Sequence, residues 1–264
     1  MTTIPLTMDN LSFKWTNNRS IIGPLSGVLS PGHITALIGP NGAGKSTVLR
    51  LLGAFLKPLS GTIRYGDQNL SRLSPSARAR ILTLVPQVLP IGFDLNVREL
   101  LSLGTYVHHS WTERIFHPRP LSELDNVIVR LQLQKLVDKP YNQLSGGEAQ
   151  RALLGMALVQ DTPVLLLDEP TAHLDPGHAQ TLIAYLKELA RVDRKIIVVA
   201  YHDLATVGLF ADTIWLMDKG QVVINGPAQN ILESNKISEI YQTHLTVTQH
   251  PVSKRTVILP QDNS

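Results

Sequence analysis

The sequence of 264 residues contains no cysteine. This absence excludes both a disulfide framework and a thiolate metal site, and it fits a reducing compartment. The sequence also lacks any apolar run that approaches the roughly 18 residues of a membrane-spanning helix, and its N-terminus lacks a signal-peptide pattern. We therefore expect a soluble protein.

Concentrated charge is missing as well. The formal net charge is +3, with no long run of like charges, and the isoelectric point is near 9.2. Such a balance gives no reason to expect nucleic-acid binding. Hydrophobic residues make up 43% of the chain, enough for the core of one large α/β domain or of two smaller ones. No internal repeat or long linker is evident.

A phosphate-binding loop is the strongest motif that the sequence does contain. It matches the pattern G-x-x-x-x-G-K-[ST] and consists of Gly39, Pro40, Asn41, Gly42, Ala43, Gly44, Lys45, Ser46 and Thr47. A buried strand is expected before it over residues 33–38, and a helix after it over residues 48–52. The glycines let backbone N–H groups surround an anion at the positive end of that helix. Lys45 would reach the β- and γ-phosphates and the Ser46 hydroxyl would bind Mg²⁺, so we predict nucleoside triphosphate binding.

A second anion site is predicted where another helix begins. Ser145 and Glu148 have the spacing of a capping box, which by itself explains both residues structurally. It does not explain Gly146 and Gly147, because each glycine costs roughly 1 kcal/mol relative to alanine inside a helix. The pair is easier to understand if an anion must approach the backbone of the first turn. The helix is expected to run to about Gln160.

Two adjacent carboxylates close a buried strand predicted over residues 163–169. Asp168 and Glu169 point to opposite faces of that strand, so they cannot do the same work. One division has Asp168 holding Mg²⁺ and Glu169 deprotonating the attacking water, while the alternative is two solvated acids. Asp175 is expected to cap the next helix, with Pro176 at its first position. His202, after a strand over residues 195–200, would by itself be interpreted as structural.

The remaining pattern alternates strands with a helical region. Strands are expected over residues 11–15, 61–66, 82–87, 213–217 and 221–225, and helices over 228–234 and 237–243. Residues 95–134 have a helical pattern, with apolar stripes at Val97, Leu100, Leu101 and Leu103 and at Leu121, Leu124, Ile128 and Leu131. Trp15 ends its strand, either in the core or stacked on a nucleotide base. The segment 108–120 breaks the helical period, and its His108, His109 and His117 fit a solvated loop better than a metal site.

Taken together, these motifs resemble the ATP-binding subunit of an ABC transporter over about residues 6–245. The matching segments, in the family's order, are residues 39–47 (Walker A), Gln87 (Q-loop), 144–148 (signature), 164–169 (Walker B), 172–175 (D-loop) and 201–203 (switch histidine). The resemblance implies an α/β P-loop NTPase (RecA-like) core with a mainly parallel sheet, an N-terminal antiparallel β part and an inserted α-helical subdomain. It places the core at residues 1–87 and 161–245, the helical subdomain at 88–160 and a short tail at 246–264.

The resemblance also implies a mechanism. In the family, two ATP-binding subunits form a head-to-tail dimer that closes on ATP and opens after hydrolysis, each ATP lying between the P-loop of one subunit and the signature of the other. The residues it assigns to catalysis are Glu169, His202, Lys45 and Gln87; to Mg²⁺, Ser46, Gln87 and Asp168; and to nucleotide binding, Trp15, residues 39–47, Ser145, Gly146, Gly147, Glu148 and Asp175. Glu169 would be the general base, and His202 would contact the γ-phosphate. Polytopic permease subunits and, indirectly, a substrate-binding protein would be partners at the cytoplasmic face of the inner membrane.

The subfamily is indicated by residues 96–109, which look like importers of iron chelates, haem and vitamin B12. Those proteins often carry L-G-R-x-P-H, where this chain has Thr105 and Val107 in place of Arg and Pro. The apolar segment 88–93 is predicted to line, in part, the groove that receives a permease helix. Alternatives are another importer or an exporter, a soluble ABC clamp on DNA or ribosomes, and an inactive regulatory subunit. The clamp is disfavoured because residues 87–145 carry no sustained heptads. Inactivity is disfavoured because the residues needed for hydrolysis are all present, namely Lys45, Asp168, Glu169 and His202.

Overall fold

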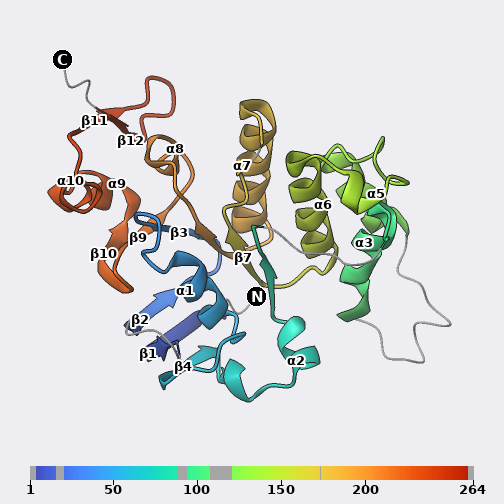
Figure 1. Cartoon of the computed structure of the whole chain (residues 1–264), viewed down its shortest axis with the longest axis horizontal. Coiled ribbons are helices and arrows are strands. Elements are labelled where there is room, and N and C mark those ends of the chain that lie inside the picture. The colour runs from blue at the N-terminus through green and yellow to red at the C-terminus, as the bar shows by residue number, and fades with distance from the viewer. Residues whose placement is uncertain (1–3, 16–20, 88–93, 108–120, 173, 261–264) are drawn as a thin grey trace.

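A computed structural model of the chain describes residues 4–15, 21–87, 94–107, 121–172 and 174–260 (Figure 1). A six-stranded sheet with the order β10-β9-β3-β8-β7-β6 forms its centre. The strands are β3 (Ile34–Ile38), β6 (Leu82–Val85), β7 (Val164–Asp168), β8 (Ile196–Ala200), β9 (Thr213–Asp218) and β10 (Gln221–Pro227). All neighbours are parallel except β10, which pairs antiparallel with β9. The predicted mainly parallel core is confirmed.

A second, antiparallel sheet has the order β2-β1-β4-β5. It consists of β1 (Leu6–Lys14), β2 (Ile21–Leu29), β4 (Ser60–Tyr65) and β5 (Gln68–Asn69). This sheet confirms the expected N-terminal antiparallel part, although β2 and β5 were not predicted from the sequence. Helix α1 (Lys45–Leu52) lies close to this sheet, in the same part of the molecule (Figure 1).

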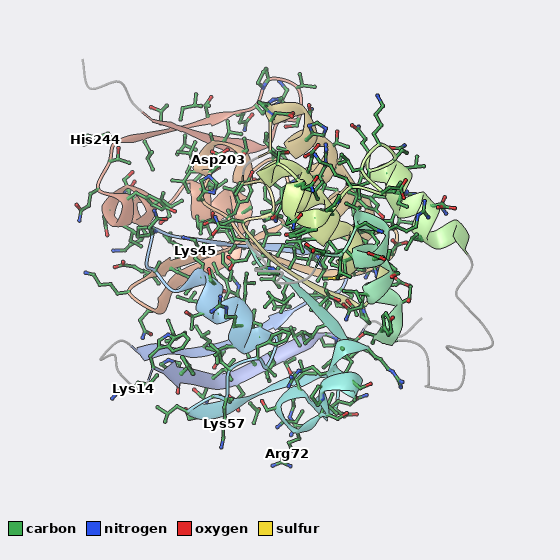
Figure 2. All side chains as sticks on the ribbon, turned by 45° about the vertical axis from the view of Figure 1, so that its right-hand side comes forward. Lys14, Lys45, Lys57, Arg72, Asp203 and His244 are labelled. Carbon is green, nitrogen blue, oxygen red and sulfur yellow. The ribbon has the colours of Figure 1, made fainter. Side chains whose placement is uncertain are left out.

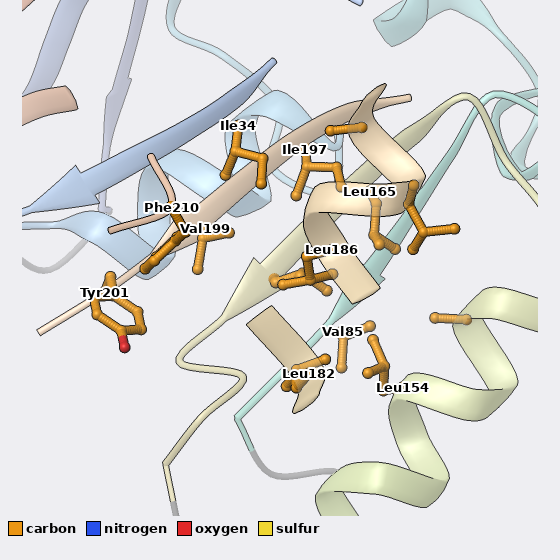
Figure 3. Close-up of a cluster of buried hydrophobic side chains, with 14 of the residues drawn as sticks. Ile34, Val85, Leu154, Leu165, Leu182, Leu186, Ile197, Val199, Tyr201 and Phe210 are labelled. Atoms are coloured by element: carbon orange, nitrogen blue, oxygen red, sulfur yellow. The ribbon is translucent and has the colours of Figure 1, made fainter. Parts of the chain in front are cut away.

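The alternation of side chains along the central strands divides the core in two. On β8, Ile197 and Val199 face one cluster, whereas Ile196 and Val198 face the other. The first cluster is covered by α7 (Pro176–Arg191), with Leu186 on the side of Leu165 and Leu182 on the side of Val85 (Figure 3). The second cluster lies between the central sheet, α1 and the antiparallel sheet. Because β7 and β8 are buried along their whole length, their sequences are continuous apolar runs.

A group of helices stands beside this core (Figure 1). It contains α3 (Val97–Leu103), the 3₁₀ turn η2 (Gly104–Val107), α5 (Leu121–Arg130), the 3₁₀ turn η3 (Tyr141–Gln143) and α6 (Gly146–Val159). Helix α6 packs against α3, α5 and η2. This helical group confirms the predicted α-helical part of the fold. Arg130 joins it to α7 by an ion pair with Glu188 at 2.9 Å.

The prediction of buried apolar stripes is wrong for one residue of the first stripe, Leu103. Leu103 is 40% exposed, whereas Val97, Leu100 and Leu101 are buried. The helical repeat brings position 104, not 103, against α6, and Gly104 stands there because a side chain would overlap the Met156 carbonyl. On the later stripe, Leu124, Ile128 and Leu131 are buried as predicted.

The C-terminal segment contains the two helices predicted over residues 228–234 and 237–243, together with a short helix and a hairpin that were not predicted from the sequence. Its elements are α8 (Leu204–Val207), α9 (Ala228–Leu232), α10 (Asn235–Tyr241) and the antiparallel hairpin of β11 (Leu245–Gln249) and β12 (Thr256–Pro260). Strand β12 packs against α8 and α9. The remaining elements are the 3₁₀ turn η1 (Leu70–Arg72) and α2 (Pro75–Ala79). Within the described part of the chain, no helix is long and apolar enough to cross a membrane.

Candidate functional site

The P-loop connects β3 to α1 and is seated tightly against its neighbours. Gly39 has φ of +151°, and a side chain there would overlap the carbonyl of Met217 on β9. The Ala43 amide donates to the Pro40 carbonyl at 3.1 Å, and the Ala43 carbonyl accepts from the Gly220 amide at 3.0 Å. The loop therefore holds its curved shape through its own hydrogen bonds and through contacts with the β9–β10 turn.

Lys45 lies inside this curve. It stands at the first position of α1 in the middle of the molecule, whereas Lys14 and Lys57 reach outward (Figure 2). Its ammonium is buried and donates to the Gly39 carbonyl at 2.7 Å and to the Pro40 carbonyl at 3.2 Å. Burial lowers the pKa of Lys45, and the nearby Glu169 and Asp168 carboxylates oppose that shift. A buried cation at the centre of a loop of backbone amides is suited to an anion such as a phosphate.

Ser46 and Asp168 form a pair of oxygen donors beside the loop. The Ser46 hydroxyl donates to Oδ1 of Asp168 at 2.9 Å. Asp168 ends β7 and is buried, and burial is the main cause that raises the pKa of its carboxyl. A divalent cation would offset the burial of this carboxylate, and Mg²⁺ prefers oxygen ligands of this kind. The residues present therefore fit the metal predicted from the sequence.

Glu169 lies beside two other predicted catalytic residues, Gln87 and His202. Its backbone turns into the left-handed region with φ of +48°, and its amide donates to the Ala200 carbonyl at 3.1 Å. Non-glycine residues held in this region are strained, and such strain is common at functional sites. The Glu169 carboxylate accepts a hydrogen bond from Nε2 of Gln87 at 3.0 Å, and Nδ1 of His202 lies 3.9 Å away. Q-loop, Walker B and switch residues are thus brought together from three strand ends.

The signature residues start α6 as the capping box predicts. The Glu148 amide donates to the Ser145 hydroxyl at 3.4 Å, and the Ser145 amide donates to the Glu148 carboxylate at 2.7 Å. The Ser145 amide is the main cause that lowers the pKa of Glu148. Ser145 and Gly146 are exposed, so an anion can approach the start of this helix. The second anion site itself stays a prediction.

Asp175 and Trp15 make mainly local contacts. Asp175 caps α7 by accepting from the His178 amide at 3.0 Å, which confirms the predicted helix start at Pro176. Trp15 follows the end of β1, is 41% exposed, and meets the ring of Phe13 edge-on at 5.0 Å. Its indole is therefore only partly in the core and remains accessible to a ligand. His178, whose ring also contacts Asp175, was not singled out from the sequence.

Three sequence predictions fall on residues outside the described part of the chain. They are the apolar segment 88–93, the histidine-containing segment 108–120, and residue 173 in the D-loop. Among the residues that the structure does describe, no group of three or more His, Cys, Asp or Glu side chains could hold a metal ion. The Ser46–Asp168 pair can therefore serve Mg²⁺ only together with further ligands, which a bound nucleotide would supply.

Comparison with known proteins gives consistent results. A family model described as ABC transporter matches residues 22–172. The hemin import ATP-binding protein of Nocardia farcinica is 35% identical over 247 residues, covering 93% of this chain and 84% of that protein. The achromobactin transport ATP-binding protein of Dickeya dadantii is 32% identical over 248 residues, covering 92% and 90%. A cobalamin import ATP-binding protein of Halobacterium salinarum is 31% identical, covering 91% and 60%.

Solved structures show the same fold. A structure described as an inward-facing metal-chelate-type ABC transporter has a TM-score of 0.80 at 25% identity, covering 98% of both chains. A dimeric cassette of a bacterial ABC transporter has a TM-score of 0.73 at 25% identity, covering 84% of this chain and 98% of that one. A second dimeric structure of that cassette, with the same scores, is bound to ADP and phosphate.

Proposed function

The chain belongs to the ABC transporter family, and on that premise we propose that it powers the import of an iron chelate, haem or a cobalamin-type molecule. The family model covers more than half of the chain. As a member of this family, the chain is an ATPase that binds ATP with Mg²⁺ and acts as a dimer with membrane permease subunits. The cargo class rests on relatives named for hemin, achromobactin and cobalamin.

One observation carries the proposed catalytic assignment, namely that Gln87 and His202 both converge on Glu169. The Glu169 carboxylate is held at 3.0 Å from the Gln87 amide and 3.9 Å from the His202 ring, so it is oriented before any substrate arrives. A carboxylate in this position can accept a proton from an attacking water. We assign Glu169 as the general base, Gln87 as the group that orients it, and His202 as a contact of the γ-phosphate.

The neighbouring residues would bind the nucleotide and the metal. Lys45 would exchange the Gly39 and Pro40 carbonyls for the β- and γ-phosphates, because an ammonium bonds an anion more strongly than a neutral carbonyl. Ser46, Asp168 and Gln87 would hold Mg²⁺, which when bound neutralises charge on the phosphates. The chain itself contributes mainly positioning and charge compensation, as expected for phosphoryl transfer.

We further propose that the site is completed by a second copy in head-to-tail orientation. Helix α6 stands with α3 and α5, apart from α1 (Figure 1), and the amide and hydroxyl of Ser145 bond to Glu148 within the same turn. An exposed first turn with two glycines can then receive the phosphates bound by another copy's P-loop, with Asp175 at the same interface. Dimeric cassettes among the solved structures support this arrangement.

Replacement of Trp15 by alanine is expected to raise the dissociation constant for ATP about tenfold. Stacking of a base on an aromatic side chain contributes about 1–3 kcal/mol, and the half-exposed Trp15 ring is accessible for it. Equilibrium binding of a fluorescent ATP analogue would measure the change. Trp15→Phe is the matched control, because it keeps an aromatic face and should bind within about threefold of the parent. Equal affinity in the alanine variant would exclude Trp15 from adenine binding.

Purification from detergent-solubilised membranes tests the transport assignment. We propose that the chain binds a polytopic permease at the cytoplasmic face of the inner membrane. A tagged chain should therefore be recovered with that permease in stoichiometric amount. A substrate-binding protein associated with that permease could then be assayed with hemin, ferric siderophores and cobalamin. Recovery of the tagged chain with ribosomes or DNA, and without a membrane protein, would contradict the proposal.

A further inference from the structure

Tyr241 has a buried hydroxyl that the mechanism above does not use. It is the last residue of α10, and its ring packs against the first core cluster. The hydroxyl oxygen is enclosed, and within the described part of the chain it has no hydrogen-bond partner. A buried polar group without a partner generally costs about 1–3 kcal/mol. A tyrosine would not be expected where a phenylalanine packs equally well, unless its hydroxyl has a role.

The polar group that most affects this hydroxyl is the backbone amide of Gly39, at the start of the P-loop. Burial raises the pKa of Tyr241 to about 12, and the Gly39 amide acts in the opposite direction. The hydroxyl therefore stays protonated at neutral pH and can accept a hydrogen bond from an N–H group. The two groups lie near each other without meeting hydrogen-bond geometry.

Gly39 is also the residue whose carbonyl holds Lys45. The Lys45 ammonium donates to that carbonyl at 2.7 Å, so a phosphate that attracts Lys45 would release it. Gly39 lacks a side chain and can change its backbone angles more freely than other residues. Movement of its Cα is restricted, because the Met217 carbonyl lies directly against it. The Gly39 carbonyl lies in the peptide group shared with Pro40 and the Gly39 amide in the one shared with Ile38, so a change in the φ and ψ angles of Gly39 is what alters the direction of the amide relative to the carbonyl.

We propose that the Tyr241 hydroxyl is a positioning group for the P-loop, and that it accepts a hydrogen bond from the Gly39 amide once nucleotide occupies the loop. The proposal rests on the ATP binding stated above. An unsatisfied hydroxyl raises the free energy of the empty state, and the new bond lowers that of the occupied state. Both effects favour nucleotide binding. They also connect α10, which immediately precedes the C-terminal hairpin, to the nucleotide site.

Tyr241→Phe tests this proposal because it removes only the hydroxyl. In the purified full-length chain without nucleotide, we expect the melting temperature of the variant to equal or exceed that of the parent. The substitution removes a buried hydroxyl that has no hydrogen-bond partner in this state. The KM for ATP should rise about fivefold, equivalent to the roughly 1 kcal/mol of one net hydrogen bond, with kcat within about twofold. The rise in melting temperature caused by Mg²⁺ and a non-hydrolysable ATP analogue should be smaller in the variant than in the parent.

Tyr65→Phe is the matched control. Tyr65 ends β4 in the antiparallel sheet, and burial also raises the pKa of its hydroxyl, so its variant should leave KM unchanged. A Tyr241→Phe chain with the parental KM overturns the proposal, whether its melting temperature falls or not. A nucleotide-free melting temperature below that of the parent also overturns it, because the hydroxyl would then have a partner in the empty state. Failure of the parent itself to bind ATP would instead refute the proposed function.

Discussion

Replacing Glu169 by glutamine is expected to lower the rate of ATP hydrolysis by at least about a hundredfold. General bases contribute typically 10²–10⁴-fold, and an amide cannot accept the proton of the attacking water. Glutamine is nearly isosteric, so its side-chain oxygen can still accept the 3.0 Å hydrogen bond from Gln87. The affinity for ATP should therefore stay within about twofold. Steady-state phosphate release and equilibrium nucleotide binding measure the two quantities separately.

Glu188→Gln provides the control for this experiment. Glu188 lies on α7 and pairs with Arg130, outside the catalytic cluster, so its variant should hydrolyse ATP within about twofold of the parent. Because the Glu169 variant binds ATP without consuming it, a closed dimer should also accumulate and appear at twice the monomer mass in light scattering. Parental hydrolysis by the Glu169→Gln chain would show that another group is the base.

The second large effect is expected on binding. Lys45→Ala should weaken ATP affinity by about a hundredfold or more, because Lys45 is the buried cation within the P-loop. Charge-assisted hydrogen bonds contribute about 1.5–3 kcal/mol each. Without the ammonium, the Asp168 and Glu169 carboxylates would also repel the phosphates at short range. Isothermal titration calorimetry with Mg²⁺-ATP measures the change.

Lys57→Ala is the matched control for charge. Lys57 is exposed and points away from the molecule (Figure 2), so its removal lowers the net charge equally and should leave ATP affinity within about twofold. The melting temperature of the Lys45 variant should remain near that of the parent, because burial of the ammonium itself carries a desolvation cost. ATP affinity within about threefold of the parent in the Lys45→Ala chain would remove Lys45 from the phosphate site.

The parts of the site that are local in sequence could be predicted from it. The P-loop, the Ser145–Glu148 capping box and the Asp175 cap each depend on a few consecutive residues whose backbone and side chains satisfy one another. The strands before the P-loop, Glu169 and His202 were predictable because central parallel strands are apolar over most of their length. These features define the strand ends and helix starts where the functional residues stand.

What could not be predicted depends on contacts between distant segments. The convergence of Gln87 and His202 on Glu169 follows from the order β8-β7-β6 of the central sheet, and no local pattern encodes strand order. The exposure of Leu103 follows from the close approach of Gly104 to α6. The hairpin of β11 and β12 is short, and much of its apolar packing is against α8 and α9. Tyr241 likewise has no sequence signal that connects it with Gly39.

We propose that one ATP site needs two copies of this chain, and a cross-linking measurement tests this directly. Because the chain has no cysteine, introduced cysteines report proximity without background. Asn41 in the P-loop and Gly146 in the signature are both exposed. In a Glu169→Gln background, chains carrying Asn41→Cys would be mixed with differently tagged chains carrying Gly146→Cys, then oxidised with and without Mg²⁺-ATP. A disulfide requires the two Cα atoms to be about 6 Å apart.

The expected result is a covalent dimer of the two tagged chains that forms in the mixture and depends on ATP. Neither variant alone should give it, because each then carries cysteines only at one side of the interface. A chain that carries both substitutions and closes an internal bridge without dimerising would contradict the two-copy site. Absence of any cross-link in the presence of bound ATP would contradict it equally.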